Sequence, residues 1–589
     1  MARFYSALFV LLLSSAPVLS LAQAPATTPD PAVAVALAAA LPPLGALTPQ
    51  QVDHVTALGQ VWGFLKYFHP AVAGGQHDWD AEFLRQLPRV LACRSVRERS
   101  RLLSAWVTSL GPVPNCATCA APPTAAVRFA ADLCWARDKH RFSAPLRRQL
   151  AFIEANRYQG PPYYVTRTGS TTNFLHEPAY AEPALPSQGL RLLGLCRYWN
   201  LFQYYYPYKY ALDQDWTRVL PELLPRFAQA STPLEYRHAA LALFARVQDG
   251  HARFYPPDPL LEAERGAYHV AADVQFLQEQ AVVVRVRHDA VVPPSPLRPG
   301  DVLTHLAGTA VAELVAQRLP ETGASNRAAQ FNTLALNLLY CATPEVQVDV
   351  VRAGQPLRLV VPAVRVGTVS PVQPAAADSM YRFLTPEIGY IDMARITPAK
   401  VPALMQAFAH TKGLIVDQRN YPGSFVATYL PAFFLTQPVA FAQFTRYDPT
   451  YPGRFLWEPA DTLRPIGATP YKPVGWTPYA GQVVVLVNEV SRSQAEFTAM
   501  AFQAGPRSTV LGSQTAGADG NSTPITLPGG LKTLLTGIGA YYPDQRETQR
   551  VGLKIDVPVR PTIAGVRDGR DELRDRAVEL ITNAPAATN

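Results

Sequence analysis

Ser493 lies where a buried strand is expected to give way to a helix. The apolar run Val483 to Val487 predicts the strand, and residues 494–503 predict the helix. At a helix start the first backbone N–H groups lack partners, and the positive end of the helix dipole is close. A serine there can attack a carbonyl carbon while these amides bind the oxyanion. The position also suits a serine that only caps the helix, so this segment alone leaves both interpretations open.

His251 is the candidate base for this serine. No histidine follows Ser493 in the chain, so an imidazole base has to come from an earlier segment. His251 ends the sequence DGH at residues 249–251. It could take the Ser493 proton and return it to a leaving amine. A histidine in such a turn can equally be a structural polar residue.

An internal repeat precedes this histidine. Both copies, residues 61–90 and 198–227, continue into helical patterns, and only the second ends in the DGH sequence. Their aromatic side chains are explained more simply by helix packing than by a ligand cage. The matched residues all lie 137 positions apart: Trp62/Trp199, Pro70/Pro207, Trp79/Trp216 and Pro88/Pro225.

The N-terminal residues predict export. Residues 1–22 combine Arg3, a short apolar run and small residues, which indicates a signal peptide cleaved before Gln23. The apolar run is too short to span a bilayer, so we expect no stable membrane insertion and a periplasmic or secreted protein. Residues 23–48 are rich in Ala and Pro and are interpreted as a linker. Although the net charge is +8, Arg and Lys are scattered, which gives little support for nucleic-acid binding.

Six cysteines in an exported chain permit disulfides, whose pairing the sequence does not reveal. Cys116, Cys119 and Cys134 could instead hold zinc, but no second CxxC or nearby His pair completes four ligands. We therefore expect disulfides or buried thiols, no metal site and no cofactor.

The second half of the chain divides into two patterns. Residues 268–368 contain short strands, and the sequence PGDVL at 299–303 with Gly308 resembles the core of a PDZ domain; another small β-rich domain is the alternative. From residue 369 onward apolar strands alternate with helices, which indicates a layered α/β core. Helices are expected at 401–410, 424–435, 494–503 and 569–581.

Three motifs follow one another in this core: DQRNYPGS at 417–424, SRSQAE at 491–496 and GSQTAG at 512–517. As an ordered set they resemble the C-terminal processing (tail-specific) serine peptidases, including the tricorn-protease core. The resemblance implies a crotonase-like α/β catalytic core behind a PDZ-like domain. It also implies a serine-type peptidase that hydrolyses flexible or C-terminally recognised polypeptides.

The resemblance assigns roles within the site. Ser493 matches the nucleophile, with Ser491 of the same turn as the alternative. One branch of the family activates its serine with a lysine in the glycine loop, but Ala518 stands there, so the tricorn-like branch with His251 as base fits better. That branch adds a glutamate at a place where this chain has Gln549. Glu547 could substitute for it, or Gln549 could orient a partner by hydrogen bonding alone. The oxyanion hole would combine the amide of Gln494 with that of Gly423 or Ser424.

The sequence therefore predicts an α/β multidomain protein with a duplicated helical region at 49–267, a PDZ-like domain at 268–368 and a peptidase core at 369–589. Its expected partners are polypeptide substrates, and a homo-oligomer is possible. The main alternative is a non-catalytic ligand- or peptide-binding protein on the same scaffold. An acyl-transfer enzyme is a weaker alternative, because no coenzyme motif supports it.

Overall fold

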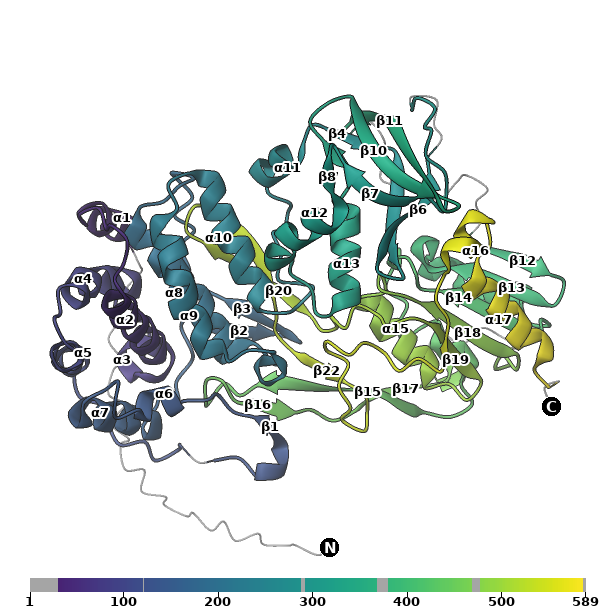
Figure 1. Cartoon of the computed structure of the whole chain (residues 1–589). Coiled ribbons are helices and arrows are strands. Elements are labelled where there is room, and N and C mark those ends of the chain that lie inside the picture. The colour runs from purple at the N-terminus through teal and green to yellow at the C-terminus, as the bar shows by residue number, and fades with distance from the viewer. Residues whose placement is uncertain (1–29, 120, 288–291, 368–379, 469–476, 586–589) are drawn as a thin grey trace, which may run out of the picture.

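The computed structural model describes residues 30–119, 121–287, 292–367, 380–468 and 477–585. The predicted signal peptide at 1–22 and its cleavage site lie outside these ranges. Helices of the first 250 residues lie at the left, the α/β core lies at the right, and a β-rich domain lies at the top, above the core (Figure 1). Among the described helices, none is both long enough and apolar enough to cross a bilayer.

The sequence repeat is also a structural repeat. Helices α2 (Pro49–Phe68) and α4 (Trp79–Leu91) correspond to α8 (Gln188–Tyr205) and α9 (Trp216–Gln229). In each copy the two tryptophans donate their indole N–H groups to each other's backbone carbonyls, at 2.8 and 3.0 Å. Buried indoles require such acceptors. The further helices of the region are α3 (Pro70–Ala73), α5 (Val96–Ser109), α6 (Cys134–Arg137), α7 (Ala144–Ala155), α10 (Pro233–Arg246) and α11 (Pro259–Arg265).

The two copies pack against each other through equivalent positions of α2 and α8. A Cβ atom at Gly63 would lie 1.8 Å from Asn200 Oδ1, and one at Gly59 would lie 2.6 Å from Cys196 Sγ. Asn200 Nδ2 donates to the Gly59 carbonyl at 2.9 Å. Because Cys196 and Asn200 follow Gly59 and Gly63 by the repeat offset, like positions face each other, as a two-fold arrangement requires.

The predicted linker at 23–48 is wrong in its middle part. Residues Pro31–Ala39 form helix α1, which packs against α4 and α8. Ala34 and Ala38 are buried in this contact. Alanine has a high helix propensity and lets helices approach closely, so an Ala-rich segment suits a packed helix as well as a linker.

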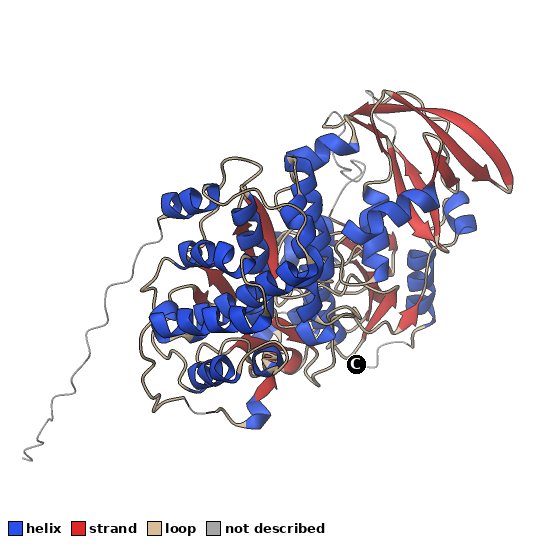
Figure 2. Cartoon of the chain, turned by 60° about the vertical axis from the view of Figure 1, so that its left-hand side comes forward, coloured by secondary structure: helices blue, strands red, loops and turns tan. Residues whose placement is uncertain are grey.

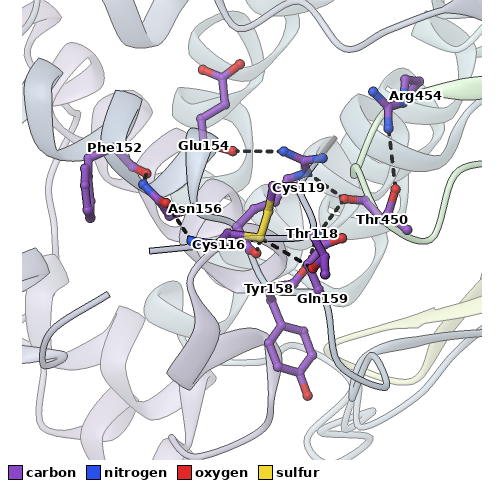
Figure 3. Close-up of a disulfide and its surroundings, with 11 residues drawn as sticks. Cys116, Thr118, Cys119, Phe152, Glu154, Asn156, Tyr158, Gln159, Thr450 and Arg454 are labelled. Atoms are coloured by element: carbon purple, nitrogen blue, oxygen red, sulfur yellow. Dashed lines mark hydrogen bonds between the residues drawn. A yellow bond between two sulfur atoms is a disulfide. The ribbon is translucent and has the colours of Figure 1, made fainter. Parts of the chain in front are cut away.

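Cys116 and Cys119 form a disulfide, with their Cα atoms 5.6 Å apart (Figure 3). The backbone N–H of Cys116 donates to Asn156 Oδ1 at 2.9 Å, which ties the bridge to the end of α7. Cys134 stays free, so the zinc alternative for these cysteines does not apply.

The β-rich domain is an eight-stranded sheet covered by α12 (Val311–Arg318) and α13 (Arg327–Leu336). Figure 2 shows it extending from the block of helices. Its core is built from valines and leucines of both layers, such as Val283, Val348 and Leu338. The sheet order is β5 (Ala272–Leu277), β6 (Gln280–Val286), β7 (Val302–Leu306), β10 (Glu345–Arg352), β11 (Gln355–Arg365), β4 (Tyr268–Val270) and β9 (Tyr340–Cys341), with β8 (Thr309–Ala310) beside β7.

A six-stranded sheet forms the centre of the α/β core, and all its neighbouring pairs are parallel except the first. Val483, Val485 and Val487 pack toward α14 (Val401–Ala407) and α15 (Gln494–Gln503). Val484 and Leu486 pack toward α17 (Glu572–Asn583). The strand order is β12 (Tyr381–Thr385), β13 (Ile388–Asp392), β14 (Gly413–Asp417), β18 (Gln482–Val487), β19 (Ser508–Gly512) and β23 (Val557–Pro558).

The helix predicted for 424–435 does not form. Only a short 3-10 turn, η6 (Pro431–Phe434), appears there. Pro431 has no backbone N–H and its ring would clash with the preceding turn of an α-helix. Phe433 and Phe434 lie in this turn and are buried in the core. The apolar pattern of residues 424–435 therefore reflects core packing and not a helix.

A hairpin of the core, β20 (Ser522–Leu527) and β21 (Leu531–Thr536), reaches into the helical region (Figure 1). Leu527 and Leu531 belong to the hydrophobic cluster of the helices. Tyr236 of α10 donates its hydroxyl to the Pro528 carbonyl at 2.9 Å. A second antiparallel sheet lies below, formed by β1 (Val127–Phe129), β16 (Phe455–Trp457), β15 (Val439–Tyr447), β17 (Asp461–Leu463) and β22 (Gly539–Tyr541).

The close contact at the repeat interface makes a testable prediction. Gly63→Ala should lower the free energy of unfolding by about 2–3 kcal/mol, because the new methyl group overlaps the Asn200 side chain. Combining it with Asn200→Ala should cost less than the sum of the two single changes, since the overlap then disappears. Urea unfolding measures all three variants.

The matched control is Gly45→Ala, because no atom lies within 4 Å of a Cβ at that position. It should change the free energy of unfolding by less than about 0.5 kcal/mol. Strict additivity of Gly63→Ala and Asn200→Ala would contradict the packing described.

Candidate active site

The three core motifs come together at one edge of the six-stranded sheet. They follow β14, β18 and β19, which are adjacent and parallel. The carboxyl ends of adjacent parallel strands meet at the same edge of a sheet, which is where α/β folds place their ligand sites. The motif at 491–496 lies in the middle of the three.

Ser493 has a strained backbone. Its φ is +52° and its ψ is −121°, whereas an ordinary capping residue has an extended conformation. A non-glycine residue held in such a sparsely populated region costs on the order of 1–3 kcal/mol, and such strain clusters at functional sites. Strained strand-to-helix turns of this kind expose the nucleophile of serine hydrolases. The conformation therefore distinguishes Ser493 from a simple cap.

Glu496 links this turn to the glycine loop, which is formed by residues 512–518. The buried carboxylate accepts hydrogen bonds from Thr515 Oγ1 at 2.5 Å and from the backbone N–H groups of Gly517, Ala518 and Ser493 at 2.8, 2.9 and 3.2 Å. Burial raises the pKa of Glu496, and these four hydrogen bonds oppose the rise. A further hydrogen bond joins the Ser493 N–H to the Ala518 carbonyl at 2.9 Å.

Asp519 is a second buried carboxyl group in the same place. The Gly520 N–H donates to its Oδ1 at 2.7 Å, while its Oδ2 has no partner among the described residues. Burial and the nearby charge of Glu496 raise the pKa of Asp519 to about 8. Asp519 is therefore protonated at neutral pH in the folded protein.

His251 is oriented by two side chains. Its Nδ1 lies 3.0 Å from Thr536 Oγ1 and 3.2 Å from Asp249 Oδ1. Thr536 gives its hydroxyl proton to Asp249 Oδ2 at 2.6 Å, so its oxygen accepts from His251 Nδ1–H. The neutral imidazole then carries its proton on Nδ1 and leaves Nε2 as the basic nitrogen.

Asp249 is fully buried beneath this histidine. Burial alone would raise its pKa, but the hydrogen bonds from His251 and Thr536 hold the pKa of Asp249 below its ordinary value. The carboxylate is thus ionised at neutral pH and can stabilise a positive imidazolium. The sequence contains the signal for this contact, an aspartate two residues before the histidine, but its role was not predicted.

The turns of His251 and Ser493 meet at Ala518. A Cβ atom at Gly250 would lie 3.1 Å from Ala518 Cβ, and the Ala518 carbonyl binds the Ser493 N–H. The Gly250 N–H also donates to Ser325 Oγ at 2.8 Å, which adds a contact from the loop before α13. Two turns that carry residues 242 positions apart in the sequence thus contact the same alanine.

Comparison with known proteins identifies the core. Residues 387–559 match the sequence model of peptidase family S41. This part of the chain is therefore a peptidase family S41 domain. The predicted relationship to the C-terminal processing serine peptidases is confirmed, and the protein is an enzyme of the serine peptidase class.

Solved structures of CPAF share the fold at low sequence identity. Mature CPAF complexed with lactacystin is 15% identical with a TM-score of 0.51, over 67% of this chain and 99% of that chain. A serine-to-alanine mutant of CPAF is 15% identical with a TM-score of 0.52, over 70% and 100%. The photosystem II D1 C-terminal processing protease is 20% identical with a TM-score of 0.36, over 66% and 98%. No curated protein sequence matches the chain.

Several residues named from the family pattern are engaged elsewhere. Glu547 forms an ion pair with Arg128 and accepts a hydrogen bond from the Tyr210 hydroxyl at 2.8 Å. Gln549 is buried, with its Nε2 3.4 Å from the Tyr206 hydroxyl and 3.5 Å from Ser325 Oγ. No hydrogen bond or ion pair in the described part of the chain joins Glu547 or Gln549 to His251. The carboxylate that contacts His251 is that of Asp249.

The predicted oxyanion hole requires a correction at Gly423. Its N–H donates to the Met393 carbonyl at 2.9 Å and is therefore not available to substrate. Gly423 is a glycine for another reason, since a Cβ atom would lie 2.4 Å from the Ala394 carbonyl oxygen. The amides of Ser424 and Gln494 remain, and Gln494 Nε2 binds the Ser424 carbonyl at 2.7 Å, which holds the two segments together.

The alternative nucleophile, Ser491, is fully buried. Its hydroxyl donates to the Gln418 carbonyl at 2.8 Å and accepts from the Asn488 N–H at 3.1 Å. These contacts give Ser491 a structural role in the turn that carries Ser493.

Asp417 and Arg419 of the first motif also have structural contacts. Arg419 pairs with Asp417 at 2.6 Å and with Asp571, the capping residue of α17, at 2.8 Å. Tyr390 donates its hydroxyl to Asp417 at 2.7 Å. This network fixes the turn after β14 to the last helix of the chain.

The raised pKa of Asp519 predicts how its replacement changes stability with pH. In the unfolded chain this carboxyl loses its proton near pH 4, whereas the folded protein keeps it to about pH 8. Between these values the unfolded state binds fewer protons, so the group lowers the free energy of unfolding as the pH rises. Asp519→Asn removes this penalty. The free energy of unfolding of the variant should therefore rise relative to that of the wild type by a few kcal/mol between pH 4 and pH 8.

Urea unfolding at pH 4.5, 6 and 8 measures the difference between the two proteins. Asp568→Asn, at an exposed position, serves as the control and should show a difference that hardly varies with pH. If the difference in free energy of unfolding between Asp519→Asn and the wild type also hardly varies with pH, the raised pKa of Asp519 is wrong.

Proposed function

We propose that the protein is an exported serine endopeptidase in which Ser493 is the nucleophile and His251 the general base. The observation that carries the proposal is the meeting of the two turns at Ala518, with His251 held through Nδ1 by Asp249 and Thr536. This arrangement has the three parts of a serine-hydrolase site: a strained nucleophile turn, an oriented base and a buried acid. The substrates are flexible or C-terminally recognised polypeptides.

The chemistry follows from these positions. Ser493 Oγ attacks the peptide carbonyl carbon as His251 Nε2 takes the hydroxyl proton, and the Asp249 carboxylate stabilises the imidazolium. The N–H groups of Ser424 and Gln494 receive the negative charge that forms on the carbonyl oxygen. His251 then gives the proton to the leaving amine. Water next attacks the acyl-enzyme while His251 takes a proton from the water, and His251 returns that proton to Ser493 Oγ as the acid product leaves.

The finer domain assignment supports a polypeptide substrate. We interpret the β-rich domain as PDZ-like, because Pro299-Gly300-Asp301 turns into β7 and Asp301 pairs with Arg352 of β10 at 2.7 Å. We interpret the core as crotonase-like from the family resemblance. PDZ domains bind an extended peptide as an added strand. The Cys116–Cys119 disulfide fits an oxidising compartment, as residues 1–22 also suggest.

The second candidate function is non-catalytic binding of a ligand or peptide on this scaffold. It is favoured by Gln549, an amide where the family pattern has a glutamate, and by the occupied N–H of Gly423. The strained conformation of Ser493 counts against it, because a binding protein has no need to maintain that cost.

Labelling by a fluorophosphonate separates the two candidates. The folded protein should react at Ser493 and should cleave an unfolded polypeptide such as reduced, alkylated casein. Ser493→Ala and His251→Ala should each lower turnover by at least about 10³-fold. Ser513→Ala, a serine of the glycine loop, is the control and should retain labelling and turnover. A folded wild-type protein that resists the reagent would support binding over catalysis.

The role of Asp249 gives a separate prediction. Asp249→Asn should lower kcat by about 10²–10⁴-fold with little change in KM, because the imidazolium loses its counter-charge and His251 can take the wrong tautomer. Thr536→Ser keeps the bridging hydroxyl and should stay close to the wild type. A Glu547→Gln or Gln549→Ala variant that loses more kcat than Asp249→Asn would show that the orienting residue had been misassigned.

A further inference from the structure

Two arginines flank the proposed catalytic pair. Arg492 directly precedes Ser493, and Arg253 follows His251 by two positions; both are exposed. The Arg253 N–H donates to the His251 carbonyl at 2.9 Å. Phe254 then pairs with Thr533, and the Tyr255 N–H donates to the Lys532 carbonyl at 3.1 Å. The segment that carries Arg253 is thus fixed along β21, the strand that also supplies Thr536.

The two arginines lie on turns that both contact Ala518, so their like charges are near each other. Desolvation and the like charge of Arg492 lower the pKa of Arg253. Within the described ranges, neither arginine has an ion pair or a side-chain hydrogen bond to a carboxylate. Other arginines near the site differ, since Arg419 is paired with Asp571 and Arg550 with Asp213. The described residues therefore leave positive charge beside Ser493 and His251 without a carboxylate partner.

Exposed aromatic rings accompany this charge. The Arg253 guanidinium lies 5.7 Å from the centre of the Tyr255 ring, and Tyr421 also contributes to its electrostatic environment. Tyr255 and Tyr421 are 53% and 46% exposed, so much of each ring is accessible to a bound peptide. Rings of this kind can hold the apolar part of a peptide while the guanidinium groups bind an anion.

We propose that Arg253 and Arg492 together bind a carboxylate of the polypeptide substrate next to the scissile bond. The inference rests on the proposed function and adds the chemical class of substrate that the site selects. A carboxylate between the two arginines removes their mutual repulsion, and each guanidinium can donate two parallel hydrogen bonds to it. The carboxylate comes either from an Asp or Glu side chain or from a free C-terminus.

Cleavage-site mapping is the first test. The wild type digests a peptide mixture made from a denatured proteome, and mass spectrometry maps the cut bonds. We expect one position next to the cut to carry Asp, Glu or the chain end at least 5-fold more often than the mixture does. Arg253→Gln with Arg492→Gln should abolish this enrichment while neutral sites are still cut. Arg101→Gln, an exposed arginine of α5, is the control.

Matched synthetic peptides then separate the two sources of the carboxylate. Each peptide is made with the acidic residue or its amide, and with a free or amidated C-terminus. The double variant should lower kcat/KM by about 10²-fold, equivalent to about 2.7 kcal/mol, for the peptide that keeps the recognised carboxylate. It should lower kcat/KM by less than about 3-fold for the matched amide. Equal losses on both peptides, or no acidic preference in the wild type, would overturn the proposal.

Binding to the Ser493→Ala protein distinguishes this proposal from the proposed function. Fluorescence anisotropy with the labelled peptides needs no turnover. Preference for the carboxylate peptide that disappears in Arg253→Gln and Arg492→Gln supports the anion site even where no peptide is cleaved. Equal affinity for carboxylate and amide peptides rejects the anion site and leaves the Ser493 assignment unaffected.

Discussion

The buried carboxylate of Glu496 is the contact on which the site depends. It lies under the Ser493 turn and accepts four hydrogen bonds, three of them from backbone N–H groups of that turn and of the glycine loop. A carboxylate this deeply buried is unfavourable unless its oxygens are well satisfied. Its hydrogen bonds therefore leave little freedom to either segment, and they offset the strain that the φ of +52° imposes on Ser493.

The same contact explains the neighbouring groups. Because Glu496 holds the negative charge of this pocket, a second charge at Asp519 would repel it in a region of low dielectric, and Asp519 stays protonated. Ala518, between Asp519 and the glycines, presents its carbonyl to Ser493 and its methyl group to Gly250. A longer side chain at 518 would push the histidine turn away, so the small residue at this position belongs with a base that comes from the helical region.

Much of the core could be predicted from the sequence, because its signals are local. The strand at 482–487, the helix at 494–503 and the order of the three motifs follow from short apolar runs and turn residues. The Trp pairs of the repeat could be matched by their constant spacing. The helix at 424–435 could not be excluded from its apolar pattern, since Pro431 and the burial of Phe433 decide its conformation.

What the sequence could not supply are contacts between distant segments. The hairpin of β20 and β21 enters the helical region and brings Thr536 to His251 and Asp249, so the contacts of Asp249 are fixed by tertiary packing. The hydrogen bond from the Gly423 N–H to the Met393 carbonyl is likewise a contact that only the folded chain reveals. Asn326 at the start of α13 adds hydrogen bonds to the Thr515 and Arg550 carbonyls at 2.8 and 3.1 Å. Helical region, β-rich domain and core thus meet at the glycine loop, and contacts from all three hold the turns of Ser493 and His251 around Ala518.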